Sequence, residues 1–409
     1  MYRLGISVVA IWNEKAKDWI TGRKDILNQI ATALNQKDRN RTIWMHCASL
    51  GEFEQGRPLL EQIRAKDSSA CIIITFFSPS GYRIRKNYPG ADFVFYLPMD
   101  GKHNARELVR LFNPSLVLWI KYEFWHYYLE ELKRRQVPAY LVSGAFRKGQ
   151  RFFTSYGSFW KNILKSFTHI FLQNHLSAQL LEEIGISGNV TVSGDTRFDR
   201  VISIAENHVP IPAIAQFCSS RQVIVAGSTW EEDEAVFIHY VRANPGKAFI
   251  IAPHEIDIEN LTEIKKAFPG SIFFSEVGNI SSVQDYHKIN VLIIDSIGLL
   301  AGLYKYADVT YVGGGFGDDG LHNILEAAVY GKPVVFGSEI DKNFEATELI
   351  DAGGAVCIEN AVELEAAMNE MLNNEVELKL KGDAARAYIY SKAGATKIVM
   401  DYLFLPPGR

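Results

Sequence analysis

The chain has 409 residues, of which 47% are hydrophobic and 22% are charged, and its formal net charge is −4 at pH 7. This composition is that of a soluble globular protein, the length favours two domains or more, and the charge gives no general attraction to nucleic acid. The four cysteines lie far apart in the sequence, which argues against a disulfide framework or a cysteine metal site and fits a reducing cytoplasm.

The chain begins with an apolar run from Leu4 to Trp12. A helix that crosses a bilayer needs about 20 apolar residues, so this run is too short to span a membrane. No small-residue cleavage site of the signal-peptide kind follows it. Two interpretations stay open, namely an apolar helix that packs on the protein and a helix that lies on a membrane surface.

From Ile43 onward, short apolar runs alternate with helical patterns, which is typical of a parallel sheet covered by helices on both faces. The strands predicted for the first half are 43–48, 70–76, 93–96, 116–120, 139–143, 169–173 and 190–193. Polar residues recur just after these strands, where open parallel sheets bind their ligands. Glu52, Glu123, Arg147 and Arg197 could therefore face a common cleft.

The alternation breaks at a proline-containing stretch, His208 to Pro212, and resumes at Gln222. We therefore expect a first domain at 1–207, a linker at 208–221 and a second domain at 222–409, whose C-terminal helices could pack back on the first. Strands of the second series are predicted at 222–229, 248–252, 272–274, 291–294, 309–312 and 333–336. The predicted fold class is α/β, with two Rossmann-like domains.

A glycine-rich loop follows the strand 309–312, with Gly313 to Gly315, Gly317 and Gly320. A helix is predicted to begin near His322 or Asn323 and to end at Gly331. Glycines and a helix start favour an anion, and a carboxylate at Glu326 could accept hydrogen bonds from sugar hydroxyls, so the unit suits a nucleotide. The simpler alternative is a tight turn with a glutamate that complements the helix dipole. The glycine spacing is neither the dinucleotide fingerprint nor the P-loop.

Together these motifs resemble one family, the 3-deoxy-D-manno-octulosonic acid (Kdo) transferases of lipopolysaccharide synthesis, which are glycosyltransferases of the GT-B fold. The resemblance covers nearly the whole chain. The motifs that carry it are S-x-G-E at 49–52, Y-L-P-x-D at 96–100, E-F-W at 123–125, G-x-x-R-F-D at 194–199, G-S-T-W at 227–230 and G-x-H-N-x-x-E at 320–326.

The resemblance implies two Rossmann-like domains with parallel sheets that face across a cleft. It implies an inverting transfer of Kdo from CMP-Kdo to a lipid A precursor, with the acceptor in the first domain and the donor in the second. The protein would be peripheral, on the cytoplasmic face of the inner membrane, with an N-terminal membrane-associating helix. No cofactor and no active-site metal are implied.

Catalytic roles can be carried over by position. Glu52 stands where the family has its general base, which would deprotonate the acceptor hydroxyl. Glu123 matches a family acid, although the preceding family acid is replaced by Lys121. Arg197 stands where many members have lysine, and either cation can stabilise charge on the leaving phosphate or the Kdo carboxylate. The simpler alternative for Glu52 is a glutamate at a helix start, and for Arg197 it is a surface ion pair. Arg147 lies in a segment where family members carry an arginine.

The family's nucleotide-binding segments map onto three parts of the second domain. The implied donor-binding residues are Pro253, His254, Glu255, Ile297, Gly298, Leu299, Gly320, His322, Asn323, Ile324, Leu325 and Glu326. Two departures stand out. The family usually has Pro-Arg-His where this chain has Pro253-His254-Glu255, which removes a cation, and Gly-Glu where it has Gly298-Leu299, which removes a carboxylate.

Basic residues cluster in the first domain among aromatic ones, a mixture that suits an anionic lipid and membrane surface, or simply a solvated face. They are Arg83, Arg85, Lys86, Lys133, Arg134, Arg135, Arg147, Lys148 and Arg151, with Phe152, Phe153, Phe159 and Trp160 between or beside them. Two other functions stay open. One is a GT-B transferase or epimerase that uses a UDP- or GDP-sugar, and the other is a catalytically silent nucleotide- or membrane-binding homologue.

Overall fold

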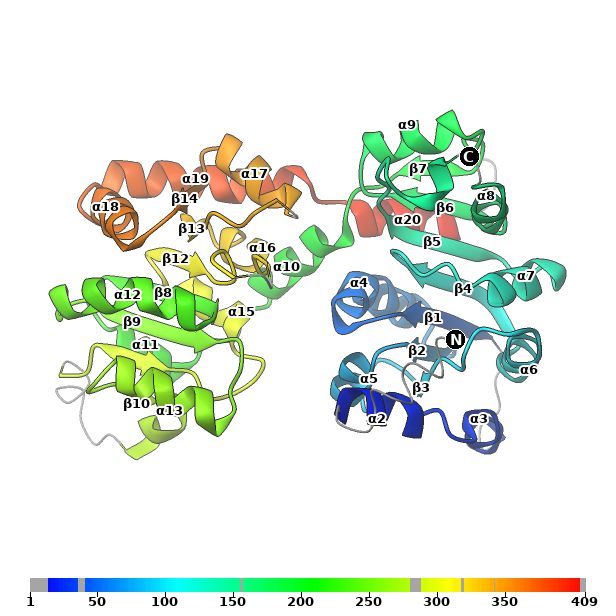
Figure 1. Ribbon diagram of the computed structural model, residues 1–409, viewed down its shortest axis with the longest axis horizontal. Helices are drawn as coiled ribbons and strands as arrows, with labels where there is room; N and C mark the ends of the chain where they lie inside the picture. The colour runs from blue at the N-terminus through cyan, green and yellow to red at the C-terminus, as the bar shows by residue number, and fades with distance from the viewer. Residues whose placement is uncertain are drawn as a thin grey trace. The chain divides into compact units, whose positions relative to one another are not determined.

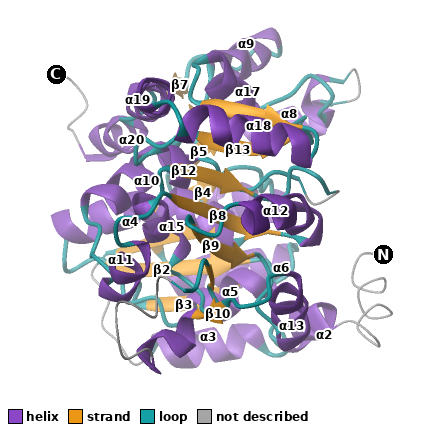
Figure 2. Cartoon of the chain, turned by 90° about the vertical axis from the view of Figure 1, so that its left-hand side faces the viewer, coloured by secondary structure: helices purple, strands orange, loops and turns teal. Residues whose placement is uncertain are grey.

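A computed structural model describes residues 14–35, 41–154, 157–279, 288–317, 320–341 and 343–404, so the apolar run Leu4 to Trp12 lies outside the described residues. The chain divides into two compact units, one formed by residues 1–200 and 393–409 and the other by residues 201–392. Within the described residues, each unit contains a seven-stranded sheet (Figure 1). Helices flank the strands (Figure 2), which confirms the α/β class.

The first sheet has the order β3-β2-β1-β4-β5-β6-β7, and its neighbouring strands are parallel. Its strands are β1 Thr42–Cys47, β2 Cys71–Phe76, β3 Phe93–Tyr96, β4 Pro114–Ile120, β5 Ala139–Gly144, β6 His169–Leu172 and β7 Val190–Val192. Its helices are α2 Glu14–Thr21, α3 Ile26–Leu34, α4 Leu50–Lys66, α5 Pro79–Arg85, α6 Lys102–Phe112, α7 His126–Arg134, η1 Arg151–Phe153, α8 Ser158–Leu164, α9 His175–Glu183, α10 Thr196–Glu206 and α20 Ala395–Phe404.

The second sheet has the order β10-β11-β9-β8-β12-β13-β14 and is also parallel. Its strands are β8 Val223–Thr229, β9 Ala248–Pro253, β10 Ile272–Phe273, β11 Val291–Ile293, β12 Val309–Val312, β13 Val334–Gly337 and β14 Ala355–Ile358. Its helices are α11 Pro212–Cys218, α12 Glu231–Ala243, α13 Ile258–Ala267, η2 Phe274–Asn279, α15 Leu300–Leu303, η3 Tyr304–Tyr306, α16 Leu325–Ala328, α17 Phe344–Asp351, α18 Ala361–Leu372 and α19 Glu375–Ser391.

The central strands of the first sheet are buried on both faces. Trp44 of β1 belongs to the core on one face, whereas Ile43 and Met45 belong to the core on the other, because successive side chains of a strand point in opposite directions. The rings of Trp44 and Trp119 pack edge to face at 5.4 Å. Burial on both faces explains why these strands are visible in the sequence as continuous apolar runs.

Near its centre, each sheet has a point at which the strand order reverses. In the first sheet it lies between β1 and β4, and in the second it lies between β8 and β12. Open parallel sheets bind ligands at such points, outside the carboxyl ends of the strands. The fold therefore directs attention to the loops after β1 and β4 in one unit, and after β8 and β12 in the other.

The division between the units differs from the expected boundary. It falls after Arg200, within α10, and the residues expected to form a linker contain α11. This helix belongs to the second unit, where the Ile211 N–H donates to the hydroxyl of Tyr306 at 2.6 Å. Pro212 lies in the first turn of α11, a position that suits proline, so the prolines begin a helix here.

The C-terminal helix α20 belongs to the first unit. Its side chains Val399 and Met400 are part of the core beside β1 and β4. The carboxylate of Asp199 accepts hydrogen bonds from the backbone N–H groups of Gly394 and Thr396, both at 2.6 Å. Asp199, the aspartate of the G-x-x-R-F-D motif, thus holds the first turn of α20 in place.

Candidate functional site

Glu52 lies in the first turn of α4, directly after β1. Its backbone N–H donates to the side chain of the N-cap residue Ser49 at 3.4 Å, and its carboxylate accepts a hydrogen bond from the N–H of Ala48. The residue is only 8% exposed. Burial raises the pKa of Glu52 to about 7 against the hydrogen bond from Ala48, and the charge of Glu123 also raises it. A carboxyl group with such a pKa is suited to general base catalysis near neutral pH.

Glu123 and Lys121 follow β4, the strand beside β1. Lys121 has a left-handed backbone conformation, with φ +66°, which turns the chain sharply at the strand end. The positive charge of Lys121 acts to lower the pKa of Glu52, whereas Glu123 acts to raise it. The carboxylate Oε2 of Glu123 lies 3.9 Å from Nε2 of His46, which is fully buried in β1. The structure therefore brings Glu52 and Glu123 together, with Lys121 and His46 beside them.

Arg197 is held by a buried acid. Nε of Arg197 donates to the carboxylate of Asp195 at 2.8 Å, and its backbone N–H donates to the other carboxylate oxygen at 2.9 Å. Asp195 is 6% exposed and also accepts hydrogen bonds from Gln173 at 2.9 Å and from Gln55 of α4 at 3.4 Å. The ion pair expected as the simpler alternative is present, but it is anchored on the helix that carries Glu52.

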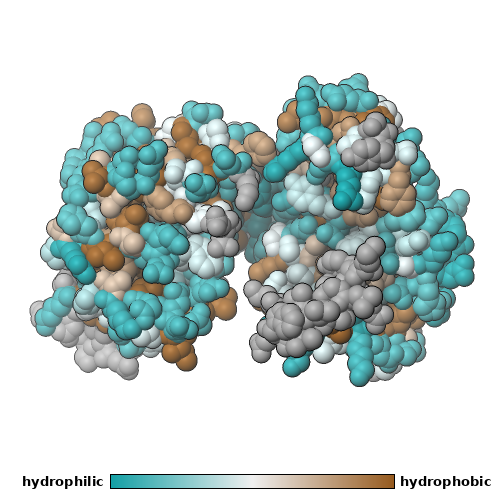
Figure 3. All heavy atoms as spheres, in the orientation of Figure 1, coloured by the Kyte–Doolittle hydropathy of each residue, from teal (hydrophilic) through white to brown (hydrophobic). Residues whose placement is uncertain are grey.

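The basic residues of the first unit are largely paired. Arg83 pairs with Asp18, and Arg85 pairs with Glu54 at 2.7 Å. Glu131 binds both Arg134 and Arg135, at 2.7 and 2.6 Å. The exposed residues include Lys86, Arg147, Lys148 and Arg151, as well as Phe159. Hydrophilic side chains cover most of the face in Figure 3, with apolar ones between them.

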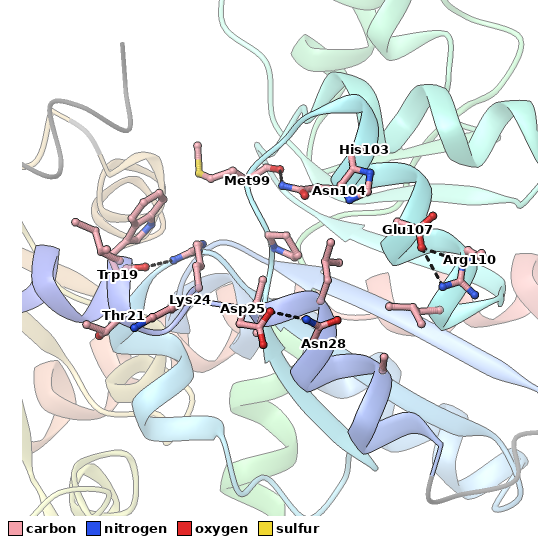
Figure 4. A pocket seen from close by; sticks show the side chains of 17 residues that line it. Trp19, Thr21, Lys24, Asp25, Asn28, Met99, His103, Asn104, Glu107 and Arg110 are labelled. Carbon is pink, nitrogen blue, oxygen red and sulfur yellow. Dashed lines mark hydrogen bonds and ion pairs between the residues drawn. The ribbon is translucent and has the colours of Figure 1, made fainter.

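A pocket of about 610 Å³ opens in the first unit between the α2–α3 segment and α6. Apolar side chains such as Trp19 and Met99 share its lining with Lys24 and His103 (Figure 4). The pocket is also beside Pro98, just after β3, so it lies toward the carboxyl ends of the strands. Its mixed lining suits a molecule that is partly apolar and partly charged.

In the second unit, the glycine loop after β12 is fastened by a buried acid. Asp233 is 1% exposed, and its carboxylate accepts hydrogen bonds from the N–H groups of Gly314 and Trp230 and from the hydroxyl of Tyr311, at 2.8, 2.9 and 2.6 Å. Burial raises the pKa of Asp233. The N–H of Gly314 is therefore satisfied within the fold.

The helix after the glycine loop is shorter than predicted, because α16 covers only Leu325–Ala328. Gly331 has φ +69°, which fits its expected place after the helix. Asn323 precedes the helix, and its side-chain amide donates to the carboxylate of Glu326 at 3.0 Å. These two residues share a face as expected, but a helix of one turn has little dipole to offer a phosphate.

Three aromatic side chains from separate loops stack in the second unit. The ring of His254 lies 4.6 Å from that of Trp230 and 4.4 Å from that of His322, with interplanar angles of 25° and 20°. Nε1 of Trp230 donates to Nε2 of His322 at 3.0 Å. The structure therefore unites His254 and His322 and adds Trp230, which the G-S-T-W motif contains but the predicted site omits.

The other predicted donor residues differ in accessibility. Ile324 and Leu325 are each 1% exposed, so their side chains belong to the core and only their backbone could meet a ligand. Pro253 is buried at the end of β9, whereas Glu255 is exposed. Three residues lie together on the loop before α15, namely Ile297, which is exposed, Gly298, with φ +92°, and Leu299. Gly320 has φ +83°, which favours glycine.

The described residues contain neither a metal-binding cluster nor a membrane-spanning helix. No group of three or more His, Cys, Asp or Glu side chains is arranged to hold a metal ion there. None of the helices in the described ranges has both the length and the apolar character to cross a membrane.

Sequence comparisons found Kdo transferases among the relatives of this chain. A family model described as 3-deoxy-D-manno-octulosonic-acid transferase (kdotransferase) matches residues 24–200. A 3-deoxy-D-manno-octulosonic acid transferase of Rickettsia felis is 26% identical over 372 residues, which cover 88% of this chain and 78% of that protein. Another, of Chlamydia trachomatis serovar A, is 28% identical over 349 residues, which cover 83% of this chain and 80% of that protein.

Structure comparisons found the same two-domain fold in distant proteins. A UDP-GlcNAc 2-epimerase of Neisseria meningitidis, bound to UDP-GlcNAc, matches with a TM-score of 0.63 at 14% identity, covering 89% of this chain and 100% of that one. A glycosyltransferase of Rickettsia africae matches with a TM-score of 0.56 at 15% identity, covering 90% and 97%. The expected GT-B fold is confirmed, while similarity at this level does not distinguish an epimerase from a transferase.

Proposed function

Since the chain is a homologue of the Kdo transferases, and so a glycosyltransferase that adds Kdo in lipopolysaccharide synthesis, we propose that its donor is CMP-Kdo and its acceptor a lipid A precursor. The observation that carries the proposed transfer reaction is the burial of the Glu52 carboxyl group together with its raised pKa. This buried carboxyl group has a pKa raised to about 7, stands in the S-x-G-E motif, and lies within the residues that the family model matches.

In the proposed reaction, the carboxylate of Glu52 accepts the proton of the acceptor hydroxyl while that oxygen attacks the anomeric carbon of Kdo. The new C–O bond forms as the bond between that carbon and the CMP phosphate oxygen breaks, so CMP leaves with the bonding electrons. Attack opposite the leaving group inverts the anomeric centre. Glu52 then returns its proton to water.

Arg197 would stabilise negative charge on the leaving phosphate or on the Kdo carboxylate. Its guanidinium is already oriented by Asp195, so little freedom is lost when the substrate binds. Glu123 would act beside Glu52, where its charge raises the pKa of the base. We propose no metal or organic cofactor, and a chelator is therefore expected to leave transfer unchanged.

The second unit would bind the donor. Glu326, with Asn323 beside it, would accept hydrogen bonds from the ribose hydroxyls. His254 stands in the sequence where the family usually has an arginine, and its stack with Trp230 and His322 would offer a flat aromatic surface to the nucleotide.

The first unit would bind the acceptor. Its pocket beside α6 combines apolar and basic side chains, as a phosphorylated, acylated sugar requires. We propose that the protein works at the cytoplasmic face of the inner membrane as a peripheral protein, with the apolar run Leu4 to Trp12 as its membrane contact.

Donor choice can be tested by binding. CMP is expected to bind at least about tenfold more tightly than UDP in isothermal titration calorimetry. Glu326→Ala should weaken CMP binding by about tenfold or more, because a charged acceptor of two hydroxyls is lost. Glu370→Ala, an exposed glutamate on α18, is the matched control and should change nothing. Tighter binding of UDP would instead support an enzyme that uses a UDP-sugar.

The pH dependence follows from Glu52. We expect kcat/KM for transfer to rise with pH through a midpoint near 7, because the base must be ionised and its pKa is raised to about 7. Below that midpoint the rate should fall by about tenfold per pH unit. A profile that stays flat from about pH 5 to about pH 9, with circular dichroism showing a folded protein throughout, would contradict this role.

A further inference from the structure

We propose that His46 is a positioning residue for Glu123, whose carboxylate lies beside Glu52. A hydrogen bond with Thr75 holds His46 as the tautomer that carries its proton on Nε2, and this N–H group donates toward Glu123. The inference rests on the proposed function and adds a residue that neither the motifs nor the comparisons single out. His46 lies near the carboxyl end of β1, the strand that leads into the S-x-G-E motif, and its side chain is completely buried.

The shortest contact of Nδ1 is compatible with the tautomer that carries its proton on Nε2. Nδ1 of His46 lies 2.9 Å from the hydroxyl oxygen of Thr75, on the neighbouring strand β2. Nε1 of Trp44 donates to that same oxygen at 2.8 Å. With a hydrogen bond from Trp44 already accepted, the hydroxyl can direct its own proton to Nδ1 of His46, which places the ring proton on Nε2. The three side chains then form a chain of hydrogen bonds with one direction, from Trp44 through Thr75 to His46.

The other ring nitrogen faces the site. Nε2 of His46 is buried without a hydrogen-bond partner among the described residues, and 3.9 Å separates it from Oε2 of Glu123. In the opposite tautomer, the Nδ1–H group could donate to the carbonyl oxygen of Thr75, which lies 3.2 Å away. Nε2 would then turn a lone pair toward the carboxylate of Glu123, which is unfavourable. The Nε2–H form instead offers a donor to an acceptor. Because the Glu123 side chain is 21% exposed, it has room to rotate and close the distance when substrate binds.

Burial is the main reason why the ring of His46 stays neutral. Burial lowers the pKa of His46, and the positive charge of Arg23 acts in the same direction, whereas Glu123 and the Thr75 backbone oppose them. Arg23 is itself held by the carbonyl oxygens of Trp19, Leu97 and Phe77. A neutral donor toward Glu123 orients the carboxylate that lies beside Glu52. The charge of that carboxylate acts to raise the pKa of Glu52.

The kinetic test compares two substitutions at this position. His46→Phe keeps a ring but removes the donor, and should lower kcat/KM by about 10- to 100-fold, as expected for a lost hydrogen bond to a charged group. His46→Gln can place an N–H near the position of Nε2 and should restore most of the activity. In the Glu123→Gln background, His46→Phe should have little further effect, since both act through one contact. Effects that multiply, or a Gln variant no better than Phe, would overturn the proposal.

His169 provides the matched control. It is also a buried histidine on a strand of the first sheet, and Nε2 of its ring lies 2.9 Å from the hydroxyl of Thr191. It begins β6, which is separated from β1 in the sheet by β4 and β5, so it lies away from the proposed site. His169→Phe should change the denaturation midpoint without changing kcat/KM. An equal loss of activity in both histidine variants would show that burial alone accounts for the effect.

A measurement without substrate separates this inference from the proposed function. Long-range ¹H–¹⁵N spectra of the wild-type chain should show His46 protonated at Nε2 and unprotonated at Nδ1 near neutral pH. Thr75→Val, which removes the hydroxyl, should change that pattern, and an Nδ1–H tautomer in the wild type would overturn the proposal. If the tautomer is as expected while no Kdo is transferred, the proposed function fails and the orientation of His46 stands.

Discussion

Glu52→Gln is expected to lower kcat for Kdo transfer by about 10²- to 10⁴-fold, the range that a positioned general base contributes. The amide has nearly the shape of the carboxylate and can still accept the hydrogen bond from Ala48, but it cannot take a proton from the acceptor. Steady-state kinetics with saturating donor would measure this loss. Glu61→Gln, on the more exposed face of the same helix, is the control and should keep full activity.

The same substitution should stabilise the fold at alkaline pH. The folded-state pKa of Glu52 is raised from 4.5 to about 7, so the ionised side chain costs stability as pH rises through that interval. At pH values above 7, Glu52→Gln should therefore gain up to about 3 kcal/mol in the free energy of unfolding, and below about pH 4.5 it should gain little. Loss of activity together with loss of stability would mean that the variant is simply misfolded, and retained activity would remove Glu52 from the mechanism.

Arg197→Ala is expected to lower kcat/KM by about 10²- to 10³-fold, because a preorganised cation would no longer meet the charge of the leaving phosphate or of the Kdo carboxylate. It should also destabilise the first unit by about 3 kcal/mol, because Asp195 would remain buried without its ion-pair partner. Arg197→Lys keeps the charge and should recover a large part of the activity. The measurements are transfer kinetics and chemical denaturation.

Arg200 is the matched control for Arg197. It lies one turn further along α10, and its ion-pair partners, Glu54 and Glu61, lie on α4. Arg200→Ala should lower stability and leave kcat/KM within about twofold of the wild type. If both arginine variants lost activity to the same extent, Arg197 would be a structural residue of the α4–α10 contact and not a participant in transfer.

The parts of the fold that the sequence predicts well are those with a local physical signature. Strands buried on both faces appear as continuous apolar runs, which is why β1, β2 and β4 could be located from the sequence pattern alone. Because ligands bind at the carboxyl ends of parallel strands, the sequence alone predicts that Glu52 and Glu123 face the same site. Their separation of many residues along the chain did not matter, because neighbouring strands supply them.

The parts that sequence reasoning missed depend on partners distant in the chain. His46 sits inside an apolar run and reads as core, so only its unpartnered nitrogen in the folded chain reveals its direction. Asp195 lies in a recognised motif, but its hydrogen bonds to Gln55 and Gln173 could not be anticipated. In both cases the missing information was a contact between strands or helices, which one sequence does not contain.

The glycine loop shows where a local pattern predicted too long a helix, since the helix after the loop has only one turn. The hydrogen bond from the N–H of Gly314 to Asp233 could not be anticipated, because Asp233 lies on a helix far earlier in the chain. The stack of Trp230, His254 and His322 likewise requires three loops that only the second sheet brings together. The expected linker contains α11 for a related reason, since a proline that suggests a linker also suits a helix start.

The most direct test of the account is the mass of the lipid product after the purified chain is incubated with CMP-Kdo, a tetraacylated lipid A precursor and a metal chelator. The account predicts release of CMP and a lipid heavier by one or more Kdo units, with no product when UDP- or GDP-sugars replace CMP-Kdo. A folded protein that releases no CMP, or that transfers a sugar only from a UDP or GDP donor, would contradict it.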